Sequence, residues 1–210
     1  MRTMSFKLLT VASSIVSLAA MSAGCGSMAS NDRSSAVVII DSLQAASGAS
    51  ANPAFSGTLQ SDVLTRGGIF SDPGRVTMRV IGKDPTDLLS IGNSVTITRY
   101  LVTFSRTDCG PQSIRPCTPG VDVPYPFDSA VTFTVTPGST STTASFELIR
   151  HTAKLESPLL GLRDQNNNIN WTIIATLADV TFFGHDQSGR NVSASGRIGV
   201  QFGDFADPTN

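Results

Sequence analysis

Residues 171–202 read WTIIATLADVTFFGHDQSGRNVSASGRIGVQF, and this stretch decides the fold. From Asn191 to Phe202, small or apolar residues alternate with mostly polar ones, which is the period of a β-strand with one buried face. Residues 186–190 (DQSGR) interrupt the pattern with turn-forming residues. The sequence therefore predicts a long hairpin, with one strand from Trp171 to His185 and a return strand from Asn191 to Phe202.

The same period of two recurs through the preceding hundred residues. Apolar side chains alternate with Thr or Arg over 76–80 and 131–135, and the pattern resumes over 144–148 after the turn 137–139. In 95–104 the apolar phase slips by one residue, which predicts a β-bulge near Arg99. A first strand is expected at Ala36–Ile40, and no long segment has the period of a helix. These patterns predict an all-β domain.

The closing hairpin, in which a terminal strand runs through Asp-x-x-Gly and returns, resembles that of immunoglobulin-like bacterial sandwich domains. The resemblance covers about thirty residues and brings no functional residue with it. It implies a two-sheet antiparallel β-sandwich, which we expect to occupy residues 36–210 as a single domain.

The N-terminus predicts export. Arg2 and Lys7 precede an uncharged stretch from Leu8 to Gly24, which is the order of a signal peptide. A membrane-spanning helix is the alternative, but the stretch is short for one and is diluted by serines. We therefore assign residues 1–24 to a signal peptide.

The end of this segment, Ser22-Ala23-Gly24-Cys25, resembles a bacterial lipobox, with Ser22 in place of the usual Leu. The resemblance implies that lipid attaches to Cys25 and that the membrane is the first partner of the mature chain. Residues 25–35 are small and polar and are expected to form a flexible tether. The alternative is ordinary signal cleavage after Ala20 or Ala23, which would leave Cys25 as a free thiol.

The residue after the lipidated cysteine bears on which membrane holds the protein. In enteric-type sorting, Asp at that position retains a lipoprotein at the inner membrane, and here the position is Gly26. The resemblance therefore favours the outer membrane within the cell envelope.

Lipidation of Cys25 leaves Cys109 and Cys117, which flank a short loop with a proline near each end. We predict a disulfide between them, as suits an oxidising compartment. A metal site would need more Cys or His nearby, and a redox role would need Cys-x-x-Cys spacing.

Charge excludes one class of partner. The chain has fifteen basic and sixteen acidic residues, and loss of Arg2 and Lys7 with the signal peptide leaves thirteen basic ones, a net charge of −3. No block of like charge appears, so no nucleic-acid partner is expected.

Enzyme signatures are missing. The sequence has no Gly-x-Ser-x-Gly, His-Glu-x-x-His, phosphate loop or dinucleotide fingerprint. Its two histidines, His151 and His185, could enter a Ser-His-Asp site, the latter with Asp186, but such a triad is defined by geometry. We predict a protein without catalytic residues, with a hydrolase whose site lies in the loops as the alternative.

A polar run that contains Asp164, Asn166 and Asn168 begins like a calcium loop, but Ile169 and Ala175 occupy its required Gly and Glu positions. We interpret it as a turn, keep the three residues as weak metal candidates, and predict no cofactor.

The segment after the predicted disulfide interleaves prolines with Tyr125 and Phe127. These aromatic residues either contact a partner or cap the open end of the core, and the second is favoured because large aromatics are mostly buried. The sequence thus predicts a lipid-anchored envelope module that binds a protein or polysaccharide partner. An assembly subunit of an envelope complex is a further alternative, which an exposed apolar patch or open sheet edge would favour.

Overall fold

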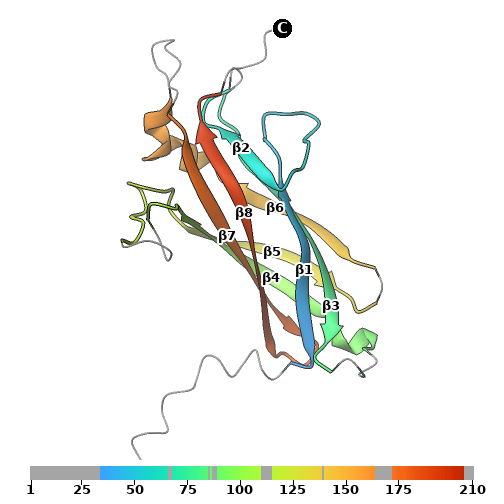
Figure 1. Cartoon of the computed structure of the whole chain (residues 1–210). Helices are drawn as coiled ribbons and strands as arrows, with labels where there is room; N and C mark the ends of the chain where they lie inside the picture. The colour runs from blue at the N-terminus through green and yellow to red at the C-terminus, as the bar shows by residue number, and fades with distance from the viewer. Residues whose placement is uncertain are drawn as a thin grey trace, which may run out of the picture.

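The structure is a computed structural model, and it describes residues 34–65, 68–84, 86, 89–109, 115–138, 140–163 and 172–205. The described strands form two packed sheets, and the helical segments among them are short 3₁₀ turns, so the predicted all-β sandwich is confirmed (Figure 1). The smaller sheet has the order β1(Ala36–Ala45), β3(Asp72–Gly82), β6(Thr142–Ile149). The larger has the order β2(Thr58–Asp62), β8(Asn191–Gly203), β7(Ile174–Asp186), β4(Val95–Ser105), β5(Phe127–Val135).

The strand order follows the scheme of immunoglobulin domains. The sheet β1-β3-β6 corresponds to their strands A, B and E, and the run β8-β7-β4-β5 corresponds to G, F, C and C′. The inter-sheet disulfide of antibody domains has no counterpart, because neither β3 nor β7 contains a cysteine.

One pairing departs from the expected antiparallel arrangement, because β2 runs parallel to β8. After β1, the chain makes a loop over 46–57 and returns to the end of β1. There the backbone N–H groups of Ala45 and Ser56 each donate to the other residue's carbonyl oxygen at 2.9 Å. The chain then continues in its original direction on the other sheet. The first strand is in effect split between the sheets, so its second half must run parallel to β8.

The closing hairpin forms as predicted. Strand β7 begins at Ile174, later than expected; residues 172 and 173 precede it without strand structure, and Trp171 lies outside the described residues. Gly189 in the turn has a φ of 75°, a conformation that glycine adopts without strain. Buried and exposed residues alternate along β8, as expected for a strand with one core face.

The predicted bulge in β4 is also confirmed. The register of β4 shifts between Ile97 and Arg99 against both of its neighbours, β5 and β7. The shift brings Tyr100 onto the core face, where the phase before the bulge would have pointed it to solvent.

Aromatic rings fill the centre of the sandwich. Phe182 is fully buried, and its ring centroid lies 5.2 Å from that of Phe146, 6.0 Å from that of Tyr100 and 6.5 Å from that of Phe133. The Tyr100 hydroxyl donates to the Glu147 carbonyl of the opposite sheet at 3.0 Å. The rings and this bond join the two sheets at mid-height.

The ends of the strands define two poles (Figure 1). At the proximal pole, β1 begins, β7 ends and β8 begins. The 3₁₀ turn η1(Ile91–Asn93), which precedes β4, also lies there. At the distal pole lie the loop 46–57, the described parts of the segment 106–126 (residues 106–109 and 115–126), and the 3₁₀ turns η2(His151–Leu155) and η3(Leu159–Leu162).

Ser34, the first described residue, is fixed at the proximal pole. Its hydroxyl donates to Asp186 Oδ2 at 2.8 Å, while Asp186 Oδ1 accepts the backbone N–H groups of Ser188 and Arg190 at 2.9 Å. Burial raises the pKa of Asp186, but these hydrogen bonds lower it more, so that the pKa lies below the ordinary value. The entering chain is thereby tied to the closing hairpin.

Candidate binding pole

The predicted disulfide is present. Cys109 and Cys117 are joined, with 4.8 Å between their Cα atoms, and Cys109 is fully buried. Chain-entropy arguments give a loop of this length a contribution of about 2.6 kcal/mol to the free energy of unfolding. The bond closes the first part of the 106–126 segment at the distal pole.

Two ion pairs order the same segment. The Arg115 guanidinium meets both carboxylate oxygens of Asp122, at 2.8 and 3.0 Å, and Arg106 meets both of Asp108 at 2.8 Å. The N–H of Thr118 also donates to Asp122, at 2.9 Å. Paired geometry of this kind is the form in which arginine holds carboxylates most specifically. Asp122 therefore acts as the internal anchor of the segment.

A pH dependence follows from this arrangement. The Arg115 guanidinium and the Thr118 N–H lower the pKa of Asp122 from its ordinary 3.8 to about 2. Because the folded-state pKa is depressed, the stabilisation of the segment is fully present above pH 3.8 and is lost as pH falls through about 2. Arg115→Ala should move the pKa of Asp122 back towards 3.8, as followed by NMR titration of the carboxyl carbon. An unchanged titration would contradict the assigned ion pair.

The two aromatic residues predicted together have different surroundings. Phe127 belongs to the core: its ring lies edge-on to Tyr100 at 6.0 Å, and the Arg150 guanidinium lies 4.5 Å from its centroid. Tyr125 is 48% exposed and packs over Gly120, where a Cβ atom would lie 2.3 Å from the Tyr125 hydroxyl. The core interpretation is right for Phe127, whereas Tyr125 lies at the surface.

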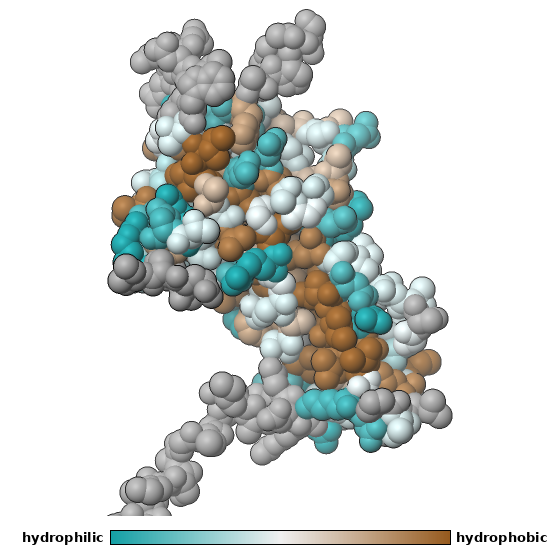
Figure 2. Space-filling view, viewed as in Figure 1, coloured by the Kyte–Doolittle hydropathy of each residue, from teal (hydrophilic) through white to brown (hydrophobic). Residues whose placement is uncertain are grey.

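Further apolar side chains are exposed at this pole. Val121 is 67% exposed in the 106–126 segment, and Ile173, before β7, is 52% exposed. Leu155 of η2 and Leu160 of η3 are also exposed. Because Arg150 lies over Phe127, η2 begins beside the end of the 106–126 segment. Figure 2 shows one apolar area at the distal end of the visible face and another over β1 and β3, where Ile81 is exposed.

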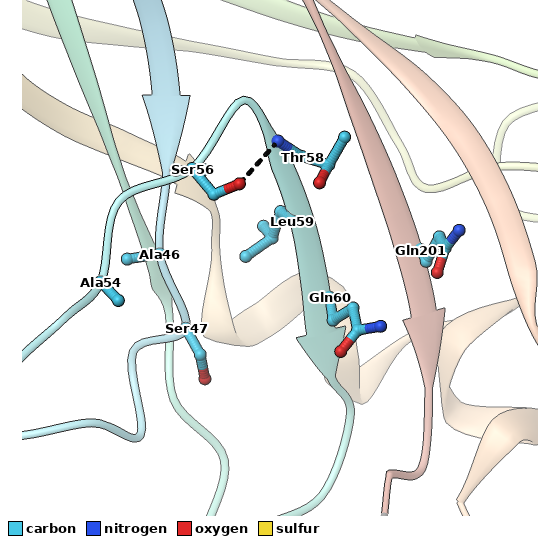
Figure 3. A pocket seen from close by; sticks show the side chains of 9 residues that line it. Ala46, Ser47, Ala54, Ser56, Thr58, Leu59, Gln60 and Gln201 are labelled. Carbon is cyan, nitrogen blue, oxygen red and sulfur yellow. Dashed lines mark hydrogen bonds between the residues drawn. The ribbon is translucent and has the colours of Figure 1, made fainter.

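A groove of about 510 Å³ lies at the same end, between the loop 46–57 and the outer surface of β2 (Figure 3). Small side chains from 45–58 line one side, while Leu59, Gln60 and Gln201 line the other. The Ser56 hydroxyl oxygen accepts a hydrogen bond from the N–H of Thr58, at 3.3 Å. The lining offers amides and hydroxyls but no charged side chain, so the groove suits a neutral polar ligand.

His185 does not form the catalytic pair with Asp186 that the sequence allows. His185 is exposed, and its Nδ1 lies 3.2 Å from the backbone carbonyl of Asp186. The Asp186 carboxylate points to the opposite, buried face, where Ser34 binds it. His151 is exposed at the start of η2, since β6 ends at Ile149. The pairing of His185 with Asp186 is therefore wrong, because neighbours on a strand face opposite sides of a sheet.

Several predicted positions lie outside the described residues: Cys25 with the signal peptide, and the weak metal candidates Asp164, Asn166 and Asn168. In the part of the chain that the structure describes, no three His, Cys, Asp or Glu side chains come together as a metal site would require. Within that same part, no helix has the length and apolar character needed to cross a membrane.

The sequence patterns missed one polar cluster entirely. Asp72 and Lys154, distant in the chain, form a buried pair at the distal pole, with 2.9 Å between Nζ and Oδ2. Ser61 of β2 joins them through a 2.6 Å hydrogen bond to the same oxygen. No local periodicity signals such a contact, because it depends on how the two sheets meet.

Comparison with known proteins assigns no family. No family model matches the chain, and no relative is found among curated proteins.

Proposed function

We propose that this protein is a lipid-anchored lipoprotein of the cell envelope, favoured at the outer membrane, whose immunoglobulin-like sandwich binds a protein partner without catalysing a reaction. The observation that carries the proposal is that the chain enters the domain at one pole and its ordered loops lie at the other. The chain enters at the proximal pole through Ser34, while the disulfide-closed segment, η2 and η3 lie at the distal pole. A tether at one end and ordered loops at the other suit a module that presents its loops away from a surface.

The chemistry of the distal pole supports a protein partner over a polysaccharide. Exposed aliphatic side chains and Tyr125 lie on segments held by a disulfide and ion pairs. Aromatic residues such as Tyr are enriched at protein interfaces, and exposed apolar surface marks sites of protein contact. The outer strands β2 and β5 of the larger sheet also have one edge without a partner strand in the described structure, which is a second means of contact for an assembly subunit.

The anchor has a direct test. Cys25→Ser removes the acceptor thiol, so the variant should move from the membrane pellet to the soluble fraction, because an acylated cysteine carries the anchoring chains. Cell fractionation and immunoblotting measure the change, and mass spectrometry of the wild-type N-terminal peptide should show acyl chains on Cys25. A pelleted Cys25→Ser variant together with an unmodified wild-type Cys25 would refute the anchor.

The binding pole is tested by a pair of substitutions at opposite ends. Tyr125→Ser removes an exposed aromatic side chain from the distal pole. Ile91→Ser removes an aliphatic side chain, 84% exposed, from the proximal pole. If the distal pole binds, chemical crosslinking in intact envelopes should lose its main product in Tyr125→Ser, by tenfold or more for an anchor worth about 2 kcal/mol. The Ile91→Ser variant should retain the product. The reverse pattern would move the interface to the proximal pole.

A further inference from the structure

Asp72 and Lys154 place an amine against a carboxyl group inside the protein. Asp72 is the first residue of β3 and Lys154 lies in η2, and their side chains are 1% and 2% exposed. Within the described residues, Nζ makes one polar contact, the 2.9 Å approach to Asp72 Oδ2. A buried ammonium group has three donors to satisfy, so the charged form of Lys154 is poorly matched to its surroundings.

The two carboxyl oxygens of Asp72 have different environments. Oδ1 accepts the backbone N–H of Gly48 at 2.9 Å, whereas Oδ2 accepts the Ser61 hydroxyl at 2.6 Å and faces Lys154. Gly48 can approach because it lacks a side chain: a Cβ atom there would lie 1.7 Å from the carbonyl oxygen of Ser71. One oxygen is thus held by a fixed backbone donor, and the other lies between an amine and a hydroxyl.

We propose that Lys154 and Asp72 condense to an intramolecular isopeptide bond. The ammonium group first passes a proton to Oδ2, which leaves a neutral amine beside a carboxylic acid. Nζ then attacks Cγ, and the negative charge that develops on Oδ1 is held by the Gly48 N–H. A second proton passes directly from Nζ to Oδ2, the oxygen it already faces, while the Ser61 hydroxyl donates its hydrogen bond to the same oxygen. Oδ2 leaves as water, so one C–N bond forms and one C–O bond breaks, with the third proton retained on the amide.

The surroundings favour this outcome over a lasting ion pair. Burial penalises the two ions more than it penalises either the neutral amine and acid or the neutral amide. The fold also holds the reacting groups in contact, which turns a slow bimolecular condensation into a reaction within one molecule. A backbone N–H aimed at the developing oxyanion is the usual means of stabilising such an intermediate.

The bond would link the start of β3 to η2 and would close a covalent ring through both sheets. The elements between its ends include β4 and β5 of the larger sheet and β6 of the smaller one. The inference is independent of the proposed function, because it concerns the covalent state of the domain and not its partner.

Peptide mass spectrometry of the purified full chain after reduction and trypsin digestion tests the proposal. We expect a branched product that joins peptide 67–75 to peptide 151–163, with a mass one water below the sum of the two. Trypsin should not cut after an acylated Lys154. Lys83 is the internal control: in the denatured protein it should be cut and should react with amine reagents, whereas Lys154 should do neither.

Two variants complete the test. Lys154→Met should abolish the branched product, and Ser61→Ala should slow its formation in newly synthesised protein, at least tenfold if the Ser61 hydrogen bond to Oδ2 assists the departure of that oxygen as water. Wild-type peptides at their full masses, with Lys154 free to react, would overturn the proposal and leave an ion pair. A branched product that forms at an unchanged rate in Ser61→Ala would overturn the role given to Ser61.

Discussion

Replacement of Phe182 by alanine is expected to lower the free energy of unfolding by about 3–5 kcal/mol, the range observed when a buried aromatic ring is removed. The ring is fully buried and lies within 6.5 Å, centroid to centroid, of three other rings. These neighbours come from both sheets, so they cannot close over the vacated space without moving the sheets together. Equilibrium unfolding in urea, followed by fluorescence or circular dichroism, measures the loss.

The next residue provides a matched control. Phe183 lies on the same strand and faces the outside of the larger sheet, where its ring lies 4.2 Å from the Arg99 guanidinium. Phe183→Ala should cost about 1 kcal/mol, the scale of an exposed cation–π contact with partial burial. Equal losses for the two variants would mean that the two faces of β7 are not core and surface as assigned.

Asp72→Ala is expected to cost about 3–5 kcal/mol, because it leaves the Lys154 amine buried without its partner. This figure applies to an ion pair. If the wild-type pair is an amide, the loss is larger, because the variant also removes a covalent cross-link between distant residues. The alanine also leaves the Ser61 hydroxyl and the Gly48 N–H without their acceptor. Urea unfolding again gives the measurement.

An exposed ion pair on the same sheet is the control. Asp41 lies 2.9 Å from Arg79, with the two side chains 29% and 51% exposed. Exposed pairs of this kind contribute at most about 1 kcal/mol, so Asp41→Ala should have a small effect. A similarly small effect of Asp72→Ala would show that solvent reaches the Asp72–Lys154 pair.

The elements that could be predicted from sequence are those whose signal is local. The alternation along β8 and the phase slip near Arg99 both reflect which face of a single strand is buried. The polarity of each side chain indicates whether that side chain faces the core or solvent. The disulfide could be predicted because lipidation of Cys25 would leave two cysteines across a short loop. Tyr125 and Phe127 belong to one motif, so the sequence predicts the same surroundings for both, whereas Phe127 is buried and Tyr125 is exposed. Sequence spacing does not say where a chain enters the core.

What the sequence could not predict depends on contacts between distant segments. Strand β2 is short and mixed in polarity, so its parallel pairing with β8 follows from the path of the loop before it. The Asp72–Lys154 pair joins residues far apart in the chain, and Lys154 stands among residues that give no sign of burial. The groove beside β2 likewise exists because the loop 46–57 meets the end of β1 and the strands β2 and β8 there.

The bond between Ser34 and Asp186 has a mechanical consequence. A pull on the entering chain is delivered at once to the start of β1 and to the β7–β8 turn, while a load at the distal pole acts on the opposite ends of the same strands. Such a force runs along the strands and therefore across the hydrogen bonds between them. The bonds would have to break together, in shear, whereas a sideways pull would open them one at a time. The strand geometry therefore predicts more resistance to tension along the strands than across them.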